Sequence, residues 1–120
     1  MKQTIYQHQF IEAFRNCNRL KTEENNGNFT IEGLRALFEY IEEYEESTGE
    51  EIELDVIGLC SDLGEYNNWK EVIQDYGYLL EREDYDSEQE YKEALLNELQ
   101  DHTTVIIIDE EDGHFIVGVF

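Results

Sequence analysis

Apolar residues recur at helical spacing in two segments of the N-terminal half. In the first segment a single stripe is formed by Tyr6, Phe10, Ile11 and Phe14. The second follows Thr30, a favoured helix N-cap, and its stripe consists of Ile31, Leu34, Leu37, Phe38 and Ile41. Gly49 is a typical helix stop, so we predict a helix over 31–48. Residues 22–28 are turn-forming and without periodicity, which predicts a loop.

Polar and apolar residues alternate over residues 52–57, which predicts a strand bounded by Gly49 and Gly58. Helical spacing returns at Trp69 and ends at Gly77. The segment Ser87–Glu90 has the pattern of a capping box. It predicts another helix, whose apolar positions are Tyr91, Ala94, Leu95 and Leu99.

The C-terminal segment has the pattern of a β-hairpin. Residues 103–108 are β-branched throughout, 109–113 form a turn sequence, and 115–120 return as the partner strand. Phe120, the last residue, is expected to be buried. The predicted order is helix, helix, strand, helix, helix, strand, strand. It indicates one acidic α+β domain over 1–120, in which about four helices pack on a small antiparallel sheet of about three strands.

Acidic residues dominate the charge, with thirty Asp and Glu against eight Lys and Arg and a formal net charge of −22. The first 35 residues are nearly neutral, and no basic residue occurs between Arg35 and Lys70. Such a charge excludes nucleic acid and anionic membranes as direct partners, because both are negative as well.

The acidity exceeds what solubility requires. A net charge of magnitude about 2–8 keeps a small domain soluble, and like charges one helical turn apart each oppose folding by about 0.2–0.5 kcal/mol. We therefore expect the charge to serve a partner with a basic surface.

Other features place limits on the class of protein. Cys17 and Cys60 are too few for a disulfide framework. The N-terminal segment has no signal-peptide pattern, and the longest apolar run, 105–108, is far too short for a membrane span. A cytoplasmic protein is expected.

Catalytic and metal-binding motifs are weak. Residues 84–88 resemble the start of a calcium loop, but Gln89 and Leu95 stand where that loop requires Gly and Glu. The His and Cys residues lack metal-ligand spacing. No phosphate-binding loop or nucleophile elbow is present, and no carboxylate pair stands out from the rest. We expect no catalytic residues, no metal and no cofactor.

The predicted helix over 31–48 has an acidic face opposite its apolar stripe. Glutamates four residues apart on it are separated by about 6 Å along the axis, a repeat that a cleft built for phosphates can accept. Tyr40 and Tyr44 lie among these acids as candidate anchors. The predicted partner-binding residues are Glu39, Tyr40, Glu42, Glu43, Tyr44, Glu46, Glu50, Glu51 and Glu53. The alternative is an ordinary solvated helix face, which explains where the acids lie but not how many there are.

Three segments of the chain resemble a family of small acidic proteins of bacteriophages and prophages. They are residues 29–40 (FTIEGLRALFEY), residues 50–60 (EEIELDVIGLC), and the C-terminal stretch that begins with residues 102–106 and continues through residues 115–117. The resemblance implies a phage accessory protein. Small acidic phage proteins often inhibit restriction enzymes, CRISPR systems or NAD-depleting defence sirtuins. It supplies no catalytic residues.

Three hypotheses follow. The first is a non-enzymatic inhibitor that blocks a bacterial anti-phage defence protein through its acidic surface, which either imitates DNA or complements a basic surface. The second is an immunity protein or antitoxin that neutralises a basic nuclease toxin. The third is an unrecognised enzyme or ion-binding protein. The target and the oligomeric state are open, as is the choice between imitating DNA and complementing a basic surface.

Overall fold

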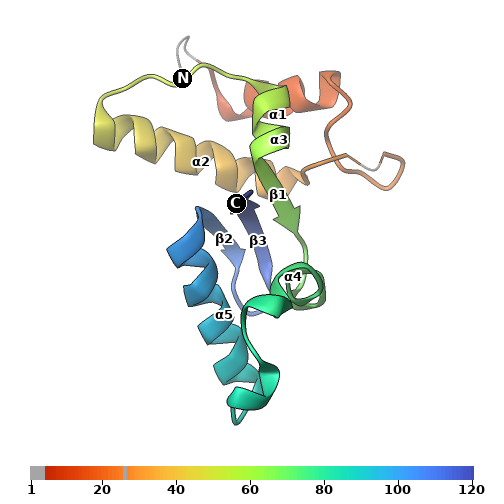
Figure 1. The fold of residues 1–120 in the computed structure, drawn as a ribbon. Coiled ribbons are helices and arrows are strands. Elements are labelled where there is room, and N and C mark those ends of the chain that lie inside the picture. Colours follow the sequence, from red (N-terminus) through yellow and green to blue (C-terminus); the bar gives the residue numbers. More distant parts are fainter. Residues whose placement is uncertain (1–4, 26) are drawn as a thin grey trace.

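The computed structural model describes residues 5–25 and 27–120, and it has the α+β architecture that the sequence predicts (Figure 1). In chain order the elements of this part are α1 (Gln7–Asn16), α2 (Ile31–Thr48), α3 (Val56–Asp62), β1 (Leu63–Tyr66), α4 (Trp69–Tyr76), η1 (Gly77–Leu79), η2 (Arg82–Asp84), α5 (Glu88–His102), β2 (Val105–Asp109) and β3 (His114–Gly118).

The three strands form one antiparallel sheet in the order β1-β3-β2. The predicted C-terminal hairpin is confirmed, with Val105 opposite Val117 and Ile107 opposite Phe115. β1 pairs with the other edge of β3 and places Tyr66 opposite Phe115. β3 is therefore the central strand, and β1 and β2 are the edges.

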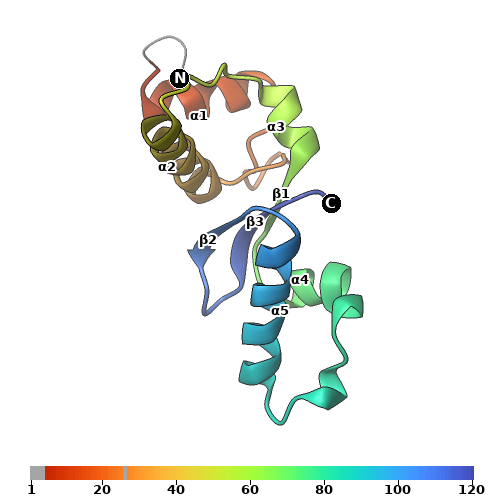
Figure 2. The same ribbon diagram turned by 60° about the vertical axis from the view of Figure 1, so that its left-hand side comes forward.

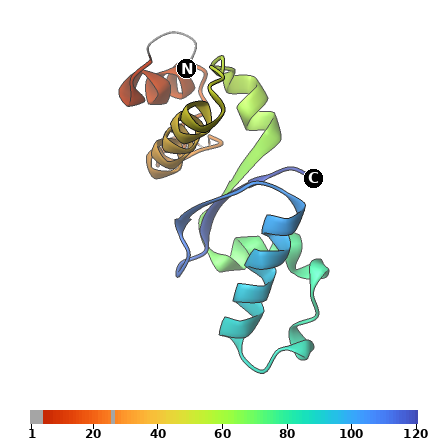
Figure 3. The ribbon, with the colours of Figure 1, turned by 90° about the vertical axis from the view of Figure 1, so that its left-hand side faces the viewer.

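Helices cover both faces of the sheet (Figures 2 and 3). Alternate residues of β3 enter different hydrophobic clusters, because successive side chains of a strand point to opposite faces. Ile116 packs with Phe10, Phe14, Leu34 and Leu37 from α1 and α2. On the other face, Phe115 and Val117 pack with Trp69, Val72, Leu95 and Leu99 from α4 and α5. β3 thus contributes to both clusters.

Local sequence signals set the helix ends. The Thr30 side chain accepts a hydrogen bond from the Gly33 N–H at 3.0 Å, and Gly49 ends α2 with a φ of 72°. The Ser87 hydroxyl accepts from the Glu90 N–H at the start of α5. The predicted boundaries of α2, α4 and the start of α5 are confirmed.

The predicted strand over 52–57 is wrong. Asp55 is the N-cap of α3, and its carboxylate accepts from the Gly58 N–H at 3.0 Å, so the chain turns helical at Val56. Ile52 and Leu54 are half-buried against the α1–α2 cluster without pairing to another strand. The first strand is β1 instead, and α3 is an additional helix.

The expected burial of Phe120 is also wrong, because 52% of this residue is exposed. β3 ends at Gly118, and the Val119 N–H donates to the carbonyl of Asp62. The chain end thereby leaves the sheet. The Phe120 ring stacks on the rings of Tyr76 and His102, at centroid distances of 5.6 and 5.2 Å.

Candidate acidic interface

All nine predicted partner-binding residues are exposed. They lie on α2 and on the segment that follows it, and they are called the acidic face from here on. At about 100° per residue, the four glutamates that α2 contributes to the acidic face (Glu39, Glu42, Glu43 and Glu46) fall within about 100° of arc. The opposite side of the helix buries Leu34, Leu37 and Ile41 in the core. The acidic face is therefore displayed by a helix that the core holds in place.

The segment after α2 is held beside the helix end. The Thr48 hydroxyl accepts a hydrogen bond from the Glu50 N–H, and the Glu45 carboxylate accepts one from the Ile52 N–H at 2.6 Å. Glu45 thus positions the backbone that presents the last three acids of the face. An open hollow of about 420 Å³ lies here, lined by Glu42, Glu45, Glu46, Gly49, Glu50 and Glu51.

Tyr40 and Tyr44 are exposed by 38% and 43%. With Glu43 and Ser47 they line a second open hollow, of about 210 Å³. Tyr66 on β1, by contrast, is partly buried, and its hydroxyl donates to Asp75 at 2.7 Å. The two tyrosines of α2 are thus available to a partner, whereas Tyr66 is occupied within the fold.

Most carboxylates of the acidic face are not neutralised from within the described residues. Six of its seven glutamates make no ion pair with any residue of 5–25 and 27–120. They are Glu39, Glu43, Glu46, Glu50, Glu51 and Glu53. Exposed like charges on one helix repel each other. A cationic surface that approaches this face removes that repulsion.

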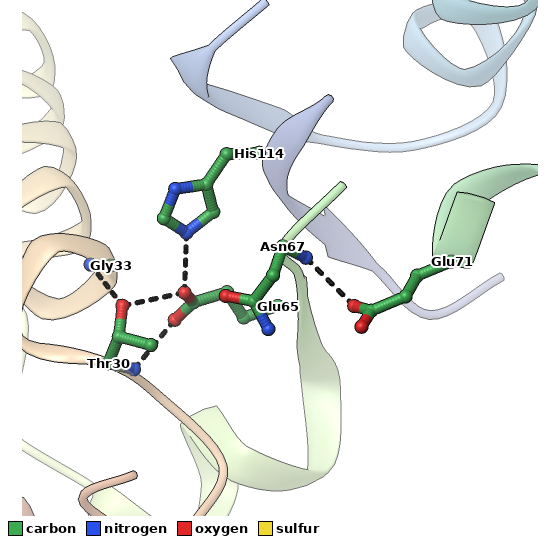
Figure 4. Close-up of polar contacts among 6 residues, drawn as sticks. All are labelled: Thr30, Gly33, Glu65, Asn67, Glu71 and His114. Carbon is green, nitrogen blue, oxygen red and sulfur yellow. Dashed lines mark hydrogen bonds and ion pairs between the residues drawn. The ribbon is translucent and has the colours of Figure 1, made fainter. Parts of the chain in front are cut away.

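A second polar cluster, which the sequence did not reveal, lies where the two halves of the chain meet (Figure 4). The Glu65 carboxylate on β1 is only 2% exposed. It accepts hydrogen bonds from the Thr30 N–H at 2.8 Å, from the Thr30 hydroxyl at 2.7 Å and from His114 Nε2 at 2.6 Å. Glu65 therefore joins the N-terminus of α2 to β1 and β3.

Gly33 makes room for this carboxylate. A Cβ atom at position 33 would overlap Oε1 and the carboxylate carbon of Glu65. A buried carboxylate at a helix N-terminus is favourable because it meets unsatisfied N–H groups and the positive end of the helix dipole. Both oxygens of Glu65 are engaged in these contacts, so the cluster fixes the orientation of α2 and of the acidic face.

Neither cluster has the geometry of a metal centre. Among the described residues there is no group of three or more His, Cys, Asp or Glu side chains arranged to hold a metal ion. No helix in this part of the chain is long and apolar enough to cross a membrane. What the acidic face can do chemically is attract and hold cations, including the Lys and Arg side chains of a protein.

Comparison with known proteins gives no further assignment: the chain matches no family, and no similar protein was found among curated proteins or solved structures.

Proposed function

We propose that this chain is a phage-encoded, non-enzymatic inhibitor that binds a bacterial anti-phage defence protein in the bacterial cytoplasm. The acidic face is its binding surface. The observation that supports the proposal most is that six exposed glutamates without an ion pair among the described residues share this surface with two exposed tyrosines.

The electrostatics favour a partner that binds nucleic acid. Four glutamates lie along one side of α2 over a length of about 10 Å, and duplex DNA carries one negative charge per about 1.7 Å of its axis. A cleft that binds phosphates therefore offers Lys and Arg side chains at comparable spacing. Exposed tyrosines beside the charges add apolar area, which salt does not screen, and such residues commonly dominate protein interfaces.

The choice of a defence protein as target follows from the resemblance to small acidic phage proteins that was inferred from the sequence. An inhibitor of this kind acts by occupancy and needs no catalytic group. Its association is fast and depends on ionic strength, because exposed charges steer the encounter and are screened beyond about 10 Å at 0.1 M salt.

The test is a pull-down from a nuclease-treated lysate of the bacterial host, using three tagged proteins. They are the wild type, the charge reversal Glu39→Lys, Glu43→Lys and Glu46→Lys, and a matched control, Glu83→Lys, Asp101→Lys and Glu111→Lys. Both variants change the charge by the same amount at exposed sites, so a general charge effect weakens both equally.

One defence protein retained by the wild type and the control, but not by the reversal, supports the proposal. Its release by salt or by competing duplex DNA identifies a phosphate-binding cleft as the contact. A small basic nuclease toxin as the main captured protein, encoded beside this chain, favours the immunity-protein alternative instead. Equal capture by all three proteins excludes the acidic face as the site.

A further inference from the structure

β2 is an edge strand whose outer backbone groups are not paired with any other described strand. Gly118 N–H donates to the carbonyl of Thr104 at 2.9 Å, so Thr104 is a hydrogen-bonded position of the β2–β3 pair. Because such positions alternate along an antiparallel pair, Ile106 also faces β3, and the N–H and C=O groups of Val105 and Ile107 point outward. These outward groups make no hydrogen bond to any residue within 5–25 and 27–120.

An open groove of about 260 Å³ is lined by residues of β2 and α2. These residues are Ala36, Glu39, Tyr40, Glu43, Val105, Ile106 and Ile107. The Ile107 side chain is 45% exposed, whereas Ile106, on the opposite face of the strand, is buried.

The groove therefore combines three features: unpaired strand backbone, exposed apolar surface and two carboxylates. Proteins usually protect such edges, because an open edge invites pairing with other chains. Here a second copy of this chain is disfavoured as the occupant, since it would bring another net charge of −22 and a second pair of groove glutamates against the first. A basic strand is attracted by the same charges.

We propose that an extended, basic segment of the partner protein adds to the sheet along the free edge of β2. Its backbone pairs with Val105 and Ile107, as in other strand-addition complexes. Its side chains on the α2 side are Lys or Arg facing Glu39 and Glu43, and those on the other side are apolar and cover Ile107. This inference rests on the proposed function, since both concern the same partner. It specifies which kind of segment that partner places against β2.

The register limits the length of the added strand. β2 is irregular between Ile107 and Asp109, where its pairing with β3 shifts. The regular free edge therefore spans residues 104–107, which is enough for about four residues of partner strand. Backbone pairing supplies affinity here, and the alternation of basic and apolar side chains supplies specificity.

The experiment uses the whole protein, labelled with ¹⁵N, and a capped six-residue peptide of alternating Lys and Val. A second peptide has the same sequence and charge but an N-methyl group on every backbone amide, so it cannot pair as a strand. Binding is followed by amide chemical shifts and by hydrogen exchange. We expect the unmodified peptide to bind at least tenfold more tightly and to protect the amide of Ile107 from exchange.

Protein variants separate this inference from the proposed function. Ile107→Pro removes one outward N–H and is expected to weaken binding of the unmodified peptide about tenfold, with little effect on the methylated one. The reversal Glu39→Lys, Glu43→Lys and Glu46→Lys is expected to abolish binding of both. The methylated peptide keeps the test valid should Ile107→Pro fail to fold.

The remaining outcomes are decisive as well. If the two peptides bind equally well and the charge reversal abolishes binding of both, strand addition is overturned. The proposal that the acidic face is the binding surface is then retained. Absence of binding at millimolar peptide, or binding unaffected by the reversal, contradicts both proposals. A further outcome, in the absence of peptide, is that the Ile107 amide becomes better protected from exchange as the protein concentration rises. That result would identify a second copy of this chain as the strand that pairs with β2, and it would overturn the proposal of a basic partner segment.

Discussion

Replacing Gly33 by alanine tests whether Glu65 fixes the orientation of α2. The new Cβ would overlap the Glu65 carboxylate, which the side chain of Thr30, its backbone N–H and His114 hold in place. The methyl group and the carboxylate cannot occupy the same space, so one of them must move. Since Gly33 lies on the first turn of a helix packed in the core, we expect the carboxylate to move.

The magnitude follows from the contacts that are lost. A hydrogen bond to a charged group contributes about 1.5–3 kcal/mol to stability, and Glu65 accepts three of them. Loss of one or two of these bonds outweighs the gain of up to about 1 kcal/mol that alanine brings over glycine in a helix. Gly33→Ala should therefore destabilise the wild type by about 2–3 kcal/mol.

The sign should reverse in a Glu65→Ala background. That substitution alone removes the acceptor of three hydrogen bonds, and it should cost about 1–3 kcal/mol for each buried donor left without a partner. Without the carboxylate, the alanine at position 33 meets no obstruction and should stabilise the protein by about 0.5–1 kcal/mol. Neighbouring residues that share an interaction are expected to be non-additive in this way.

Urea unfolding of the four proteins, followed by far-UV circular dichroism and by the fluorescence of Trp69, measures both effects. The expected result is an unfavourable effect of Gly33→Ala in the wild type and a favourable one in the Glu65→Ala protein. A stabilising effect of Gly33→Ala in both backgrounds would refute the packing of Glu65 against α2.

Further predictions concern single side chains. Burial and the hydrogen bonds with Tyr76 and Asp75 raise the pKa of Tyr66 above its usual value near 10. Above about pH 10 the unfolded chain releases a proton from this tyrosine that the folded chain retains. The free energy of unfolding is therefore expected to fall as the pH rises above about 10. Ultraviolet titration should show one tyrosine ionising late, and Tyr66→Phe should remove that step. Gly113→Ala should cost more than about 2 kcal/mol by thermal unfolding, because Gly113 has a φ of 80° and a Cβ would lie 2.8 Å from the Trp69 Cα. Glu43→Lys should stabilise the protein by about 0.5–1 kcal/mol at low salt, and the gain should vanish at about 1 M salt; an unchanged gain at high salt would rule out charge repulsion as its cause.

Local patterns predicted the parts of the fold that local interactions stabilise. α2 begins and ends where Thr30 and Gly49 place its ends, and its apolar stripe is buried as its spacing requires. The acidic face of α2 follows from the same periodicity. Glu45 is not among the predicted residues, and the structure gives its carboxylate a backbone partner in the Ile52 N–H.

Non-local contacts account for what sequence reasoning missed. β1 contains Gly64 and Glu65, which have low strand propensity, and it is a strand because it pairs with β3 about fifty residues away. The alternation over 52–57 resembled a strand better than β1 does. No spacing rule links Thr30, Glu65 and His114, which are separated by 35 and 49 residues. Such a cluster becomes visible only when the sheet brings its members together.

The most direct test of the account is phage plating on bacteria that each carry one defence system, with this chain or a variant expressed in the cell. The account predicts that the wild type restores plating at least tenfold against one of the restriction, CRISPR or sirtuin systems. The control Glu83→Lys, Asp101→Lys and Glu111→Lys should do the same, and the reversal Glu39→Lys, Glu43→Lys and Glu46→Lys should not. Unchanged plating in every strain, or full activity of the reversal, would contradict the account.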